Sequence, residues 1–117
     1  MTEVMRTFWQ LIDAADWVGL RALLDDDFRA RFAHTGEEFD ADGFVRFNAD
    51  YPGRWRAEVV ELVRDGDREV TRTRVFDDSE EHWVASFGES RDGRLVALVE
   101  VWADGTSTPP EGSRASS

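Results

Sequence analysis

A single carboxylate interrupts an apolar stretch near the end of the chain. In residues 95–102, LVALVEVW, seven apolar side chains surround Glu100, and no basic residue lies within five positions of it. Burial in an apolar cavity disfavours the charged form and raises a carboxyl pKa by up to ~3–5 units where no partner is near. Such a group can exchange protons near neutral pH. We therefore interpret Glu100 as facing a pocket, as a general base or a ligand anchor. The alternative is a structural carboxylate tied to nearby donors.

Two histidines are the other candidates for proton transfer. His82 is expected on the same strand face as Glu100, where the carboxylate would orient its ring and the pair would pass a proton. Beside Glu80 and Glu81, however, a surface histidine is ordinary, so both readings stay open. His34, before a Thr-Gly turn, either closes over the pocket mouth or bonds within the turn. Two distant histidines do not form a metal site, and the sequence predicts neither a metal nor a cofactor.

Strand pairing decides which side chains share a face with Glu100. The segment RDG at residues 91–93 suits a three-residue hairpin loop with Gly93 in the left-handed conformation. That loop pairs Ser86 with Leu98, Val84 with Glu100 and His82 with Trp102. A two-residue loop at residues 78–79 adds Thr71, Thr73 and Val75 to the same face. Polar groups converging among apolar ones are typical of a small-molecule pocket. The predicted lining, besides Glu100 and His82, is Phe8, Trp9, Ile12, Phe32, His34, Thr71, Thr73, Val84, Ser86, Leu98 and Trp102.

The elements that position these residues follow from hydrophobic periodicity. Helical spacing runs from Val4 to Ala15 with Thr2 as the N-cap, and Asp16 caps a second helix that ends at residues 25–27. Residues 28–32 alternate as a short strand, and Asp40 caps a third helix that ends at residues 51–53. Asn48 on that helix either lines the pocket entrance or bonds a nearby loop. Strands are predicted at 55–64, 68–77, 80–90 and 94–103, which makes an α+β domain over residues 1–104. Residues 105–117 have little to bury and are predicted to be a disordered tail.

The opposite face of the sheet is also largely apolar, although a one-sided sheet would be polar there. We expect a second subunit to cover this convex face, giving a homodimer, with Arg74 stacking on Trp83 near its edge.

Composition excludes several classes of partner. The 117 residues carry a net charge of −11, which disfavours nucleic acid and anionic membranes, because both attract basic proteins. No cysteine is present, and neither a signal peptide nor a membrane-spanning stretch is recognisable. The expected protein is soluble and cytoplasmic.

The ordered set of motifs resembles the nuclear-transport-factor-2-like superfamily, in particular its SnoaL-like branch. The matching segments are FWQLIDAADWVGLRALLDDDF, TGEEFDADGFVRFNADYPG and SRDGRLVALVEVW, which together cover nearly all of residues 3–103. The resemblance implies three N-terminal helices over a curved antiparallel sheet, a cone with an internal pocket, and inward positions for Glu100 and Trp102.

The superfamily includes ketosteroid isomerase, scytalone dehydratase, limonene epoxide hydrolase, polyketide cyclases and many non-enzymatic members, so its fold alone assigns no chemistry. The isomerase triad is absent, because its matching positions hold Phe8, Phe32 or a neighbour, and Ser86. The Asp-Arg-Asp set of the epoxide hydrolases is not formed either. Two hypotheses follow: a cofactor-independent acid–base enzyme (a cyclase, isomerase, dehydratase or hydrolase) on a small apolar substrate, or a non-catalytic dimeric binding or assembly module.

Overall fold

The computed structural model describes residues 3–104. This part of the chain holds three helices, α1 (Val4–Asp13), α2 (Trp17–Leu23) and α3 (Ala41–Asp50). Its six strands are β1 (Leu24–Phe32), β2 (Glu38–Asp40), β3 (Arg56–Asp65), β4 (Arg68–Phe76), β5 (Glu81–Arg91) and β6 (Arg94–Asp104). They form one sheet in the order β2-β1-β6-β5-β4-β3, in which only β1 and β6 run parallel. The predicted tail at 105–117 lies outside the described residues.

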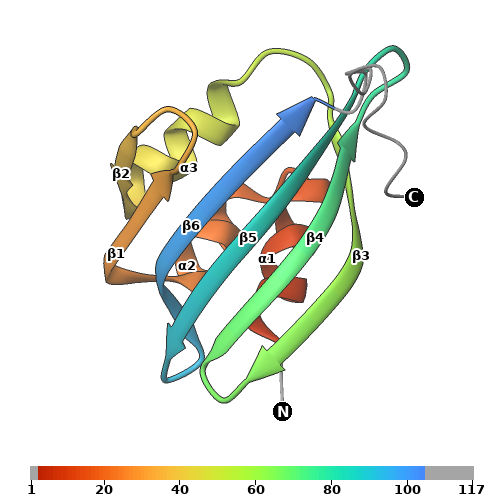
Figure 1. The fold of residues 1–117 in the computed structure, drawn as a ribbon. Coiled ribbons are helices and arrows are strands. Elements are labelled where there is room, and N and C mark those ends of the chain that lie inside the picture. The colour runs from red at the N-terminus through yellow and green to blue at the C-terminus, as the bar shows by residue number, and fades with distance from the viewer. Residues whose placement is uncertain (1–2, 105–117) are drawn as a thin grey trace.

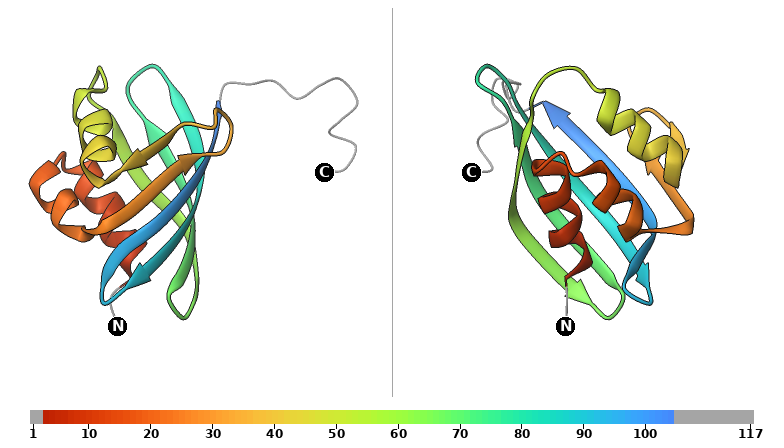
Figure 2. Two further views of the ribbon diagram at one scale, coloured as in Figure 1. Left: turned by 90° about the vertical axis from the view of Figure 1, so that its left-hand side faces the viewer. Right: turned by 180° about the vertical axis from the view of Figure 1, so that it is seen from behind.

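All three helices lie on one face of a curved sheet, and the other face is turned outward (Figures 1 and 2). The predicted fold class, α+β with three helices over a curved, mostly antiparallel sheet, is confirmed. The core fills the space between the layers, with Met5, Phe8, Leu20, Phe28 and Phe44 almost fully buried. None of the described helices is long and apolar enough to cross a membrane.

The strands from β3 to β6 begin and end within one residue of their predicted bounds. The first strand is longer than predicted, because Asp25, Asp26 and Asp27 lie in β1 and do not end α2. Arg91 holds two of these carboxylates, with its Nη2 at 3.1 Å from Asp25 Oδ1 and 3.3 Å from Asp27 Oδ2. The ion pairs with Arg91 offset the repulsion between these carboxylates, so the acidic residues are accommodated at the start of β1.

Side chains satisfy the N–H groups at the start of each helix. As predicted, Asp16 caps α2 and Asp40 caps α3, by accepting from the N–H groups of Gly19 and Gly43. Helix α1 differs. Its predicted cap, Thr2, lies outside the described residues, and the cap position is Glu3, whose side chain bonds no helix N–H group.

The first N–H groups of α1 are satisfied from the sheet. Glu69 on β4 accepts from Val4 N at 3.0 Å and from Met5 N at 2.9 Å, and only 3% of this residue is exposed. A carboxylate at this end also complements the positive end of the helix dipole. Glu69 therefore anchors α1 to the sheet across more than sixty residues of sequence.

The β5–β6 hairpin turns differently from the prediction. Asp92 and Gly93 have φ angles of 55° and 80°, and Arg91 pairs with Arg94, which is a two-residue turn. Positive φ at both central positions is what this turn requires, and Asp-Gly supplies it. The predicted three-residue loop was wrong.

A bulge then corrects the register. The pairing shifts between Glu89 and Ser90, so that Ser90 pairs with Leu95 and Glu89 with Ala97. Leu95 is buried in place of Val96, which was predicted to point inward. Beyond the bulge, Ser86 pairs with Glu100, Val84 with Trp102 and His82 with Asp104. Each pairing differs by two residues from the prediction, and a shift of two leaves every side chain on its predicted face.

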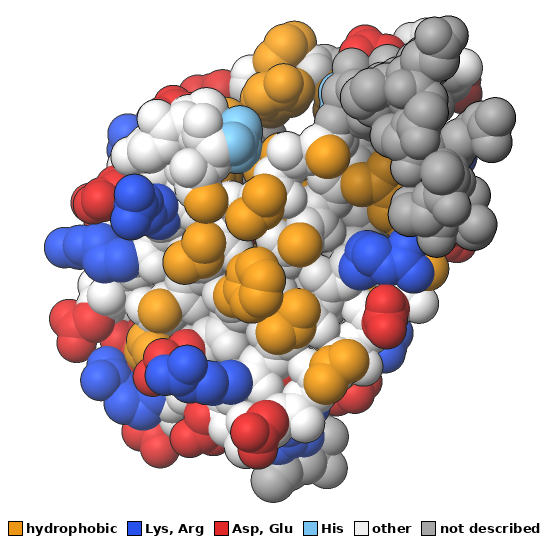
Figure 3. Space-filling model, in the orientation of Figure 1, with side chains coloured by type: hydrophobic (Ala, Val, Ile, Leu, Met, Phe, Trp, Pro, Cys, Tyr) orange, Lys and Arg blue, Asp and Glu red, His pale blue; other side chains and the backbone are white. Residues whose placement is uncertain are grey.

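The outer face of the sheet carries a continuous apolar patch. Figure 3 shows hydrophobic side chains gathered over the middle strands, with charged groups around them. The patch includes Val70, Phe87, Val99 and Val101, each more than a third exposed.

The predicted stacking of Arg74 on Trp83 was wrong. Arg72 lies over the Trp83 ring, 5.4 Å from its centroid. Arg74 lies over the ring of Phe76 and pairs with Glu81, which draws its guanidinium away from Trp83.

Glu69→Ala should lower the free energy of unfolding by about 1–3 kcal/mol, because two buried N–H groups lose their acceptor. Urea unfolding followed by circular dichroism measures the loss. Glu58→Ala, on the exposed side of β3, is the control and should change stability by less than about 0.5 kcal/mol. Equal effects of the two substitutions would contradict the anchoring role of Glu69.

Candidate ligand-binding and acid–base site

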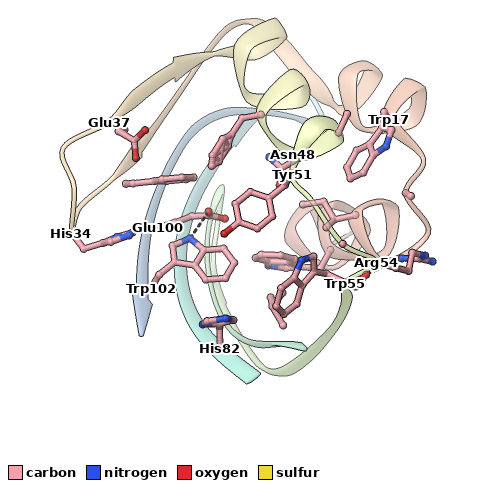
Figure 4. Close-up of a pocket in the computed structure, with 18 residues that line it drawn as sticks. Trp17, His34, Glu37, Asn48, Tyr51, Arg54, Trp55, His82, Glu100 and Trp102 are labelled. Atoms are coloured by element: carbon pink, nitrogen blue, oxygen red, sulfur yellow. Dashed lines mark hydrogen bonds between the residues drawn. The ribbon is translucent and has the colours of Figure 1, made fainter. Parts of the chain in front are cut away.

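A cavity of about 500 Å³ opens between the helices and the inner face of the sheet (Figure 4). Its wall is mainly aromatic, formed by Trp9, Trp17, Phe32, Phe47, Tyr51, Trp55 and Trp102. The polar residues that line it are His34, Glu37, Asn48, Arg54, His82 and Glu100. The remaining lining residues are small or aliphatic: Ile12, Ala15, Ala49, Gly53 and Val75. An apolar hollow with few polar groups is the usual form of a small-molecule site.

Glu100 is the buried titratable group of this cavity, with 2% of the residue exposed. Its Oε1 accepts a hydrogen bond from the Trp102 indole N–H at 3.1 Å. Burial raises the pKa of Glu100 from 4.5 to about 7, because the apolar surroundings disfavour the carboxylate. The Trp102 N–H and the nearby Ser86 hydroxyl act in the opposite direction and lower this pKa by less. At neutral pH both the acid and the carboxylate are therefore populated.

Three buried polar atoms on the inner face of the sheet lack a hydrogen-bond partner of ordinary geometry among the described residues. They are Glu100 Oε2, Ser86 Oγ and Thr73 Oγ1. The strand ladder gathers them, because Ser86 pairs directly with Glu100, and Thr73 pairs with Val84 next to them. Buried polar atoms in folded proteins almost always have a partner. Glu100 Oε2 is therefore a carboxyl oxygen at the cavity wall that is almost closed to solvent and lacks the partner that such atoms usually have.

The structure brings part of the predicted pocket together. Glu100, His82, Trp9, Ile12, Phe32, His34 and Trp102 line the cavity. The other predicted lining residues do not, namely Phe8, Thr71, Thr73, Val84, Ser86 and Leu98, all of which are buried in the core. The reason is the position of α1. Trp9 reaches across the sheet and donates its indole N–H to Thr71 Oγ1 at 3.2 Å, so Thr71 is covered, and Phe8 packs edge-on against Trp9.

His82 does not form the predicted proton-passing pair with Glu100. Its Nε2 lies 3.5 Å from Glu80 Oε1, and its ring lies 5.5 Å from that of Trp55 at the mouth. On β5 it stands four residues from Ser86, the direct partner of Glu100, which is about 13 Å along a strand. The two-residue register shift explains the difference, because the predicted register made His82 the diagonal neighbour of Glu100.

Sequence reasoning missed the contribution of residues 51–55, which join α3 to β3. Tyr51, Gly53, Arg54 and Trp55 all line the cavity, and Trp55 Nε1 donates to Pro52 O at 3.0 Å. The available signal was a Pro-Gly break with an aromatic residue on each side, which marks a turn but not the direction of the rings.

The mouth is held by other polar contacts. Asn48 lines the cavity, and its side-chain N–H donates to Phe44 O at 2.8 Å within α3, not to a loop. Asp13, at the end of α1, accepts from the Arg56 side chain and from Ala57 N, and these bonds lower its pKa. They fix the end of α1 to β3 beside the opening.

Comparison with solved structures identifies the fold. A candidate ketosteroid isomerase from Kribbella flavida is 25% identical, with a TM-score of 0.85 over 95% of this chain and 83% of that one. An NTF-2-like protein of unknown function from Burkholderia xenovorans is 21% identical, with a TM-score of 0.82 over 97% and 88%. A candidate polyketide cyclase from Streptomyces antibioticus is 19% identical, with a TM-score of 0.73 over 85% and 88%. No protein-family model and no curated protein matches the sequence.

The fold and cavity define a cone-shaped α+β protein with an internal pocket. The chain has the fold of nuclear-transport-factor-2-like proteins, as its sequence motifs predicted.

The raised pKa of Glu100 predicts a stability that depends on pH. The folded-state pKa of about 7 exceeds the ordinary value of 4.5, so the folded protein binds this proton more tightly than the unfolded chain. The carboxyl therefore costs stability as pH rises from 4.5 to 7, by up to about 3 kcal/mol in total, and the full cost is present above pH 7. Glu100→Gln removes this titration.

Urea unfolding of both proteins at several pH values tests this. The stability of Glu100→Gln relative to wild type should increase by about 3 kcal/mol between pH 4.5 and pH 8. A difference that stays constant with pH would show that Glu100 has an ordinary pKa in the folded state.

Proposed function

We propose that this protein binds a small, largely apolar molecule in the cavity and that Glu100 exchanges a proton with it, without a cofactor. The observation that carries this proposal is the position of Glu100, buried at the cavity wall with Oε2 unpartnered and a pKa of about 7. General acid–base catalysis is most efficient when the catalytic pKa lies near the working pH. Solved structures of the same fold include a candidate isomerase and a candidate polyketide cyclase, which is compatible with such chemistry.

The roles of the surrounding groups follow from their positions. Trp102 is a positioning residue, since its N–H donates to Oε1 and fixes the orientation of the carboxyl group. The aromatic wall excludes water and keeps the local dielectric low, which maintains the raised pKa. His82 belongs to the mouth and has no part in this proton transfer, because Glu80 and Trp55 hold it there.

Proton abstraction from 5-nitrobenzisoxazole, a neutral planar compound, tests the proposal without knowledge of the natural substrate. The base removes the proton on C3, the N–O bond breaks, and a nitrile and a phenolate form. The wild-type rate should increase with pH and level off above about 7, because the carboxylate is the active form. Glu100→Gln should lose at least ~100-fold of this rate.

Glu58→Gln on the exposed side of β3 is the matched control and should retain the wild-type rate. The proposal fails if Glu100→Gln and wild type react equally fast.

The exposed patch on the outer face favours a second candidate function, a dimeric binding or assembly module. We propose that this patch, centred on Phe87, Val99 and Val101, packs against the same patch of a second copy. Charge pairs such as Arg72 with Glu61 and Arg68 with Glu89 stand around the patch, so its rim carries both signs. A two-fold axis would pack the apolar centre of one copy against that of the other, and the charged residues of both rims would surround the contact.

Phe87→Asp should convert a dimer to a monomer, because the substitution places a charge in the centre of the contact. Sedimentation velocity over a range of concentrations measures this. Val18→Asp, an exposed apolar position on α2 on the opposite side of the sheet, is the control and should leave the dimer intact. A wild-type protein that remains monomeric at high concentration would refute the dimer.

A further inference from the structure

The aromatic wall of the cavity presents ring faces and few hydrogen-bond donors. Three of its indole N–H groups are already bonded: Trp9 to Thr71 Oγ1 at 3.2 Å, Trp55 to Pro52 O at 3.0 Å and Trp102 to Glu100 Oε1 at 3.1 Å. What these rings offer a ligand is therefore their π faces. The negative face of an aromatic ring attracts cations, and tryptophan attracts them most strongly.

Two carboxyl groups and one amide oxygen are acceptors that line the cavity. Glu100 Oε2 has no hydrogen-bond partner of ordinary geometry among the described residues. The Asn48 side-chain oxygen accepts no hydrogen bond from these residues, while one of its two N–H groups donates to Phe44 O. A second carboxylate, Glu37, also lines the cavity. A ligand group that faces Glu100 is therefore suited to bring positive charge or a proton.

The basic groups of the cavity stand at its rim and bond elsewhere. Arg54 donates to Trp55 O at 2.8 Å and to Asp13 O at 3.1 Å. His82 lies beside Glu80, and His34 stacks on Phe32 with ring centroids 5.9 Å apart. Figure 4 shows these three side chains around the edge of the cavity, away from the Glu100 carboxyl. Within residues 3–104, therefore, no cation of the protein pairs with Glu100.

We propose that the ligand of this cavity is an organic cation, an apolar body carrying a protonated or quaternary nitrogen that faces Glu100. This inference rests on the proposed function of the cavity and narrows its ligand class. The carboxylate would act as counter-ion in a low-dielectric site, where charge pairing is stronger than in water. The rings would contact the rest of the cation. A net charge of −11 would also concentrate cations around the protein.

Two compounds of the same shape separate charge from size. Benzyltrimethylammonium and neopentylbenzene differ by a positive nitrogen in place of a carbon, and neither titrates. Isothermal titration calorimetry with wild-type protein at pH 8 should give at least ~10-fold tighter binding of the ammonium compound, about 1.4 kcal/mol. The comparison of the two compounds with wild-type protein shows whether the cavity prefers a cation, and it needs no variant.

The variant Glu100→Gln tests whether Glu100 causes the preference for the cationic compound. This variant should bind neopentylbenzene as wild type does and lose the preference for the cation. Circular dichroism and a thermal melt check that the variant is folded.

Lowering the pH provides a second readout. Binding of benzyltrimethylammonium to wild type should weaken as pH falls from 8 to 6, because protons compete for Glu100. The other titratable groups of the cavity are His34, Glu37, Tyr51, Arg54 and His82, which come from the loop after β1, the end of α3, the loop before β3, and β5. The same titration with Glu100→Gln measures how much these groups contribute to the pH dependence of binding. Their contribution should be smaller than that of Glu100.

The possible outcomes are distinguishable. Equal binding of the two compounds, or tighter binding of the neutral one, would overturn the cation proposal and leave the apolar pocket of the proposed function standing. Binding of neither compound would contradict both. A cation preference that Glu100→Gln retains in full would overturn the assignment of Glu100 as the counter-ion.

Discussion

The site depends on one physical constraint, a carboxyl group held in an apolar cavity without a basic partner. A charged group costs much more to bury than a neutral one, so the protein lowers the cost by letting Glu100 hold its proton up to a pKa of about 7. An arginine beside it would remove this property, because a neighbouring positive charge stabilises the carboxylate. Arg54 is in the same cavity but is bonded to backbone oxygens at the rim. The same arrangement is the basis of the proposed proton exchange, because it brings the pKa of Glu100 near neutrality.

The Glu100 carboxyl points into the cavity because of two features of the β5–β6 hairpin, its two-residue turn and its bulge. With the two-residue turn at Asp92 and Gly93 alone, Glu100 would pair with Ala85 and point to the outer face. The bulge at Val96 adds one residue to β6, so that Glu100 pairs with Ser86 and points inward. One residue more or less in this hairpin would reverse every side chain beyond it. The bulge is therefore as necessary to the site as Glu100 itself.

The helices complete the cavity because long-range polar contacts fix their positions. Glu69 holds the start of α1, and Asp13 holds its end against β3 through Arg56 and Ala57. Between these anchors, Trp9 covers Thr71 and limits how deep the cavity extends. Residues 51–55 then supply the wall that the sheet and α1 leave open. The cavity thus has a rigid floor on the strands and a mouth built from a loop.

The sequence by itself determined the kinds of element and their order, apart from the short strand β2. It predicted the inward direction of Glu100 from a hairpin loop that differs from the observed one, and the bulge restores that direction. Helical and alternating periodicities, and the caps Asp16 and Asp40, are local properties that need no information about the rest of the chain. The tertiary structure decided which residues meet. The bulge at Val96, the anchoring of α1 by Glu69, the placing of His82 beside Glu80 and the turning of Tyr51 and Trp55 into the cavity all depend on contacts between distant segments. Such contacts are selected by packing of the whole core, which no local pattern encodes.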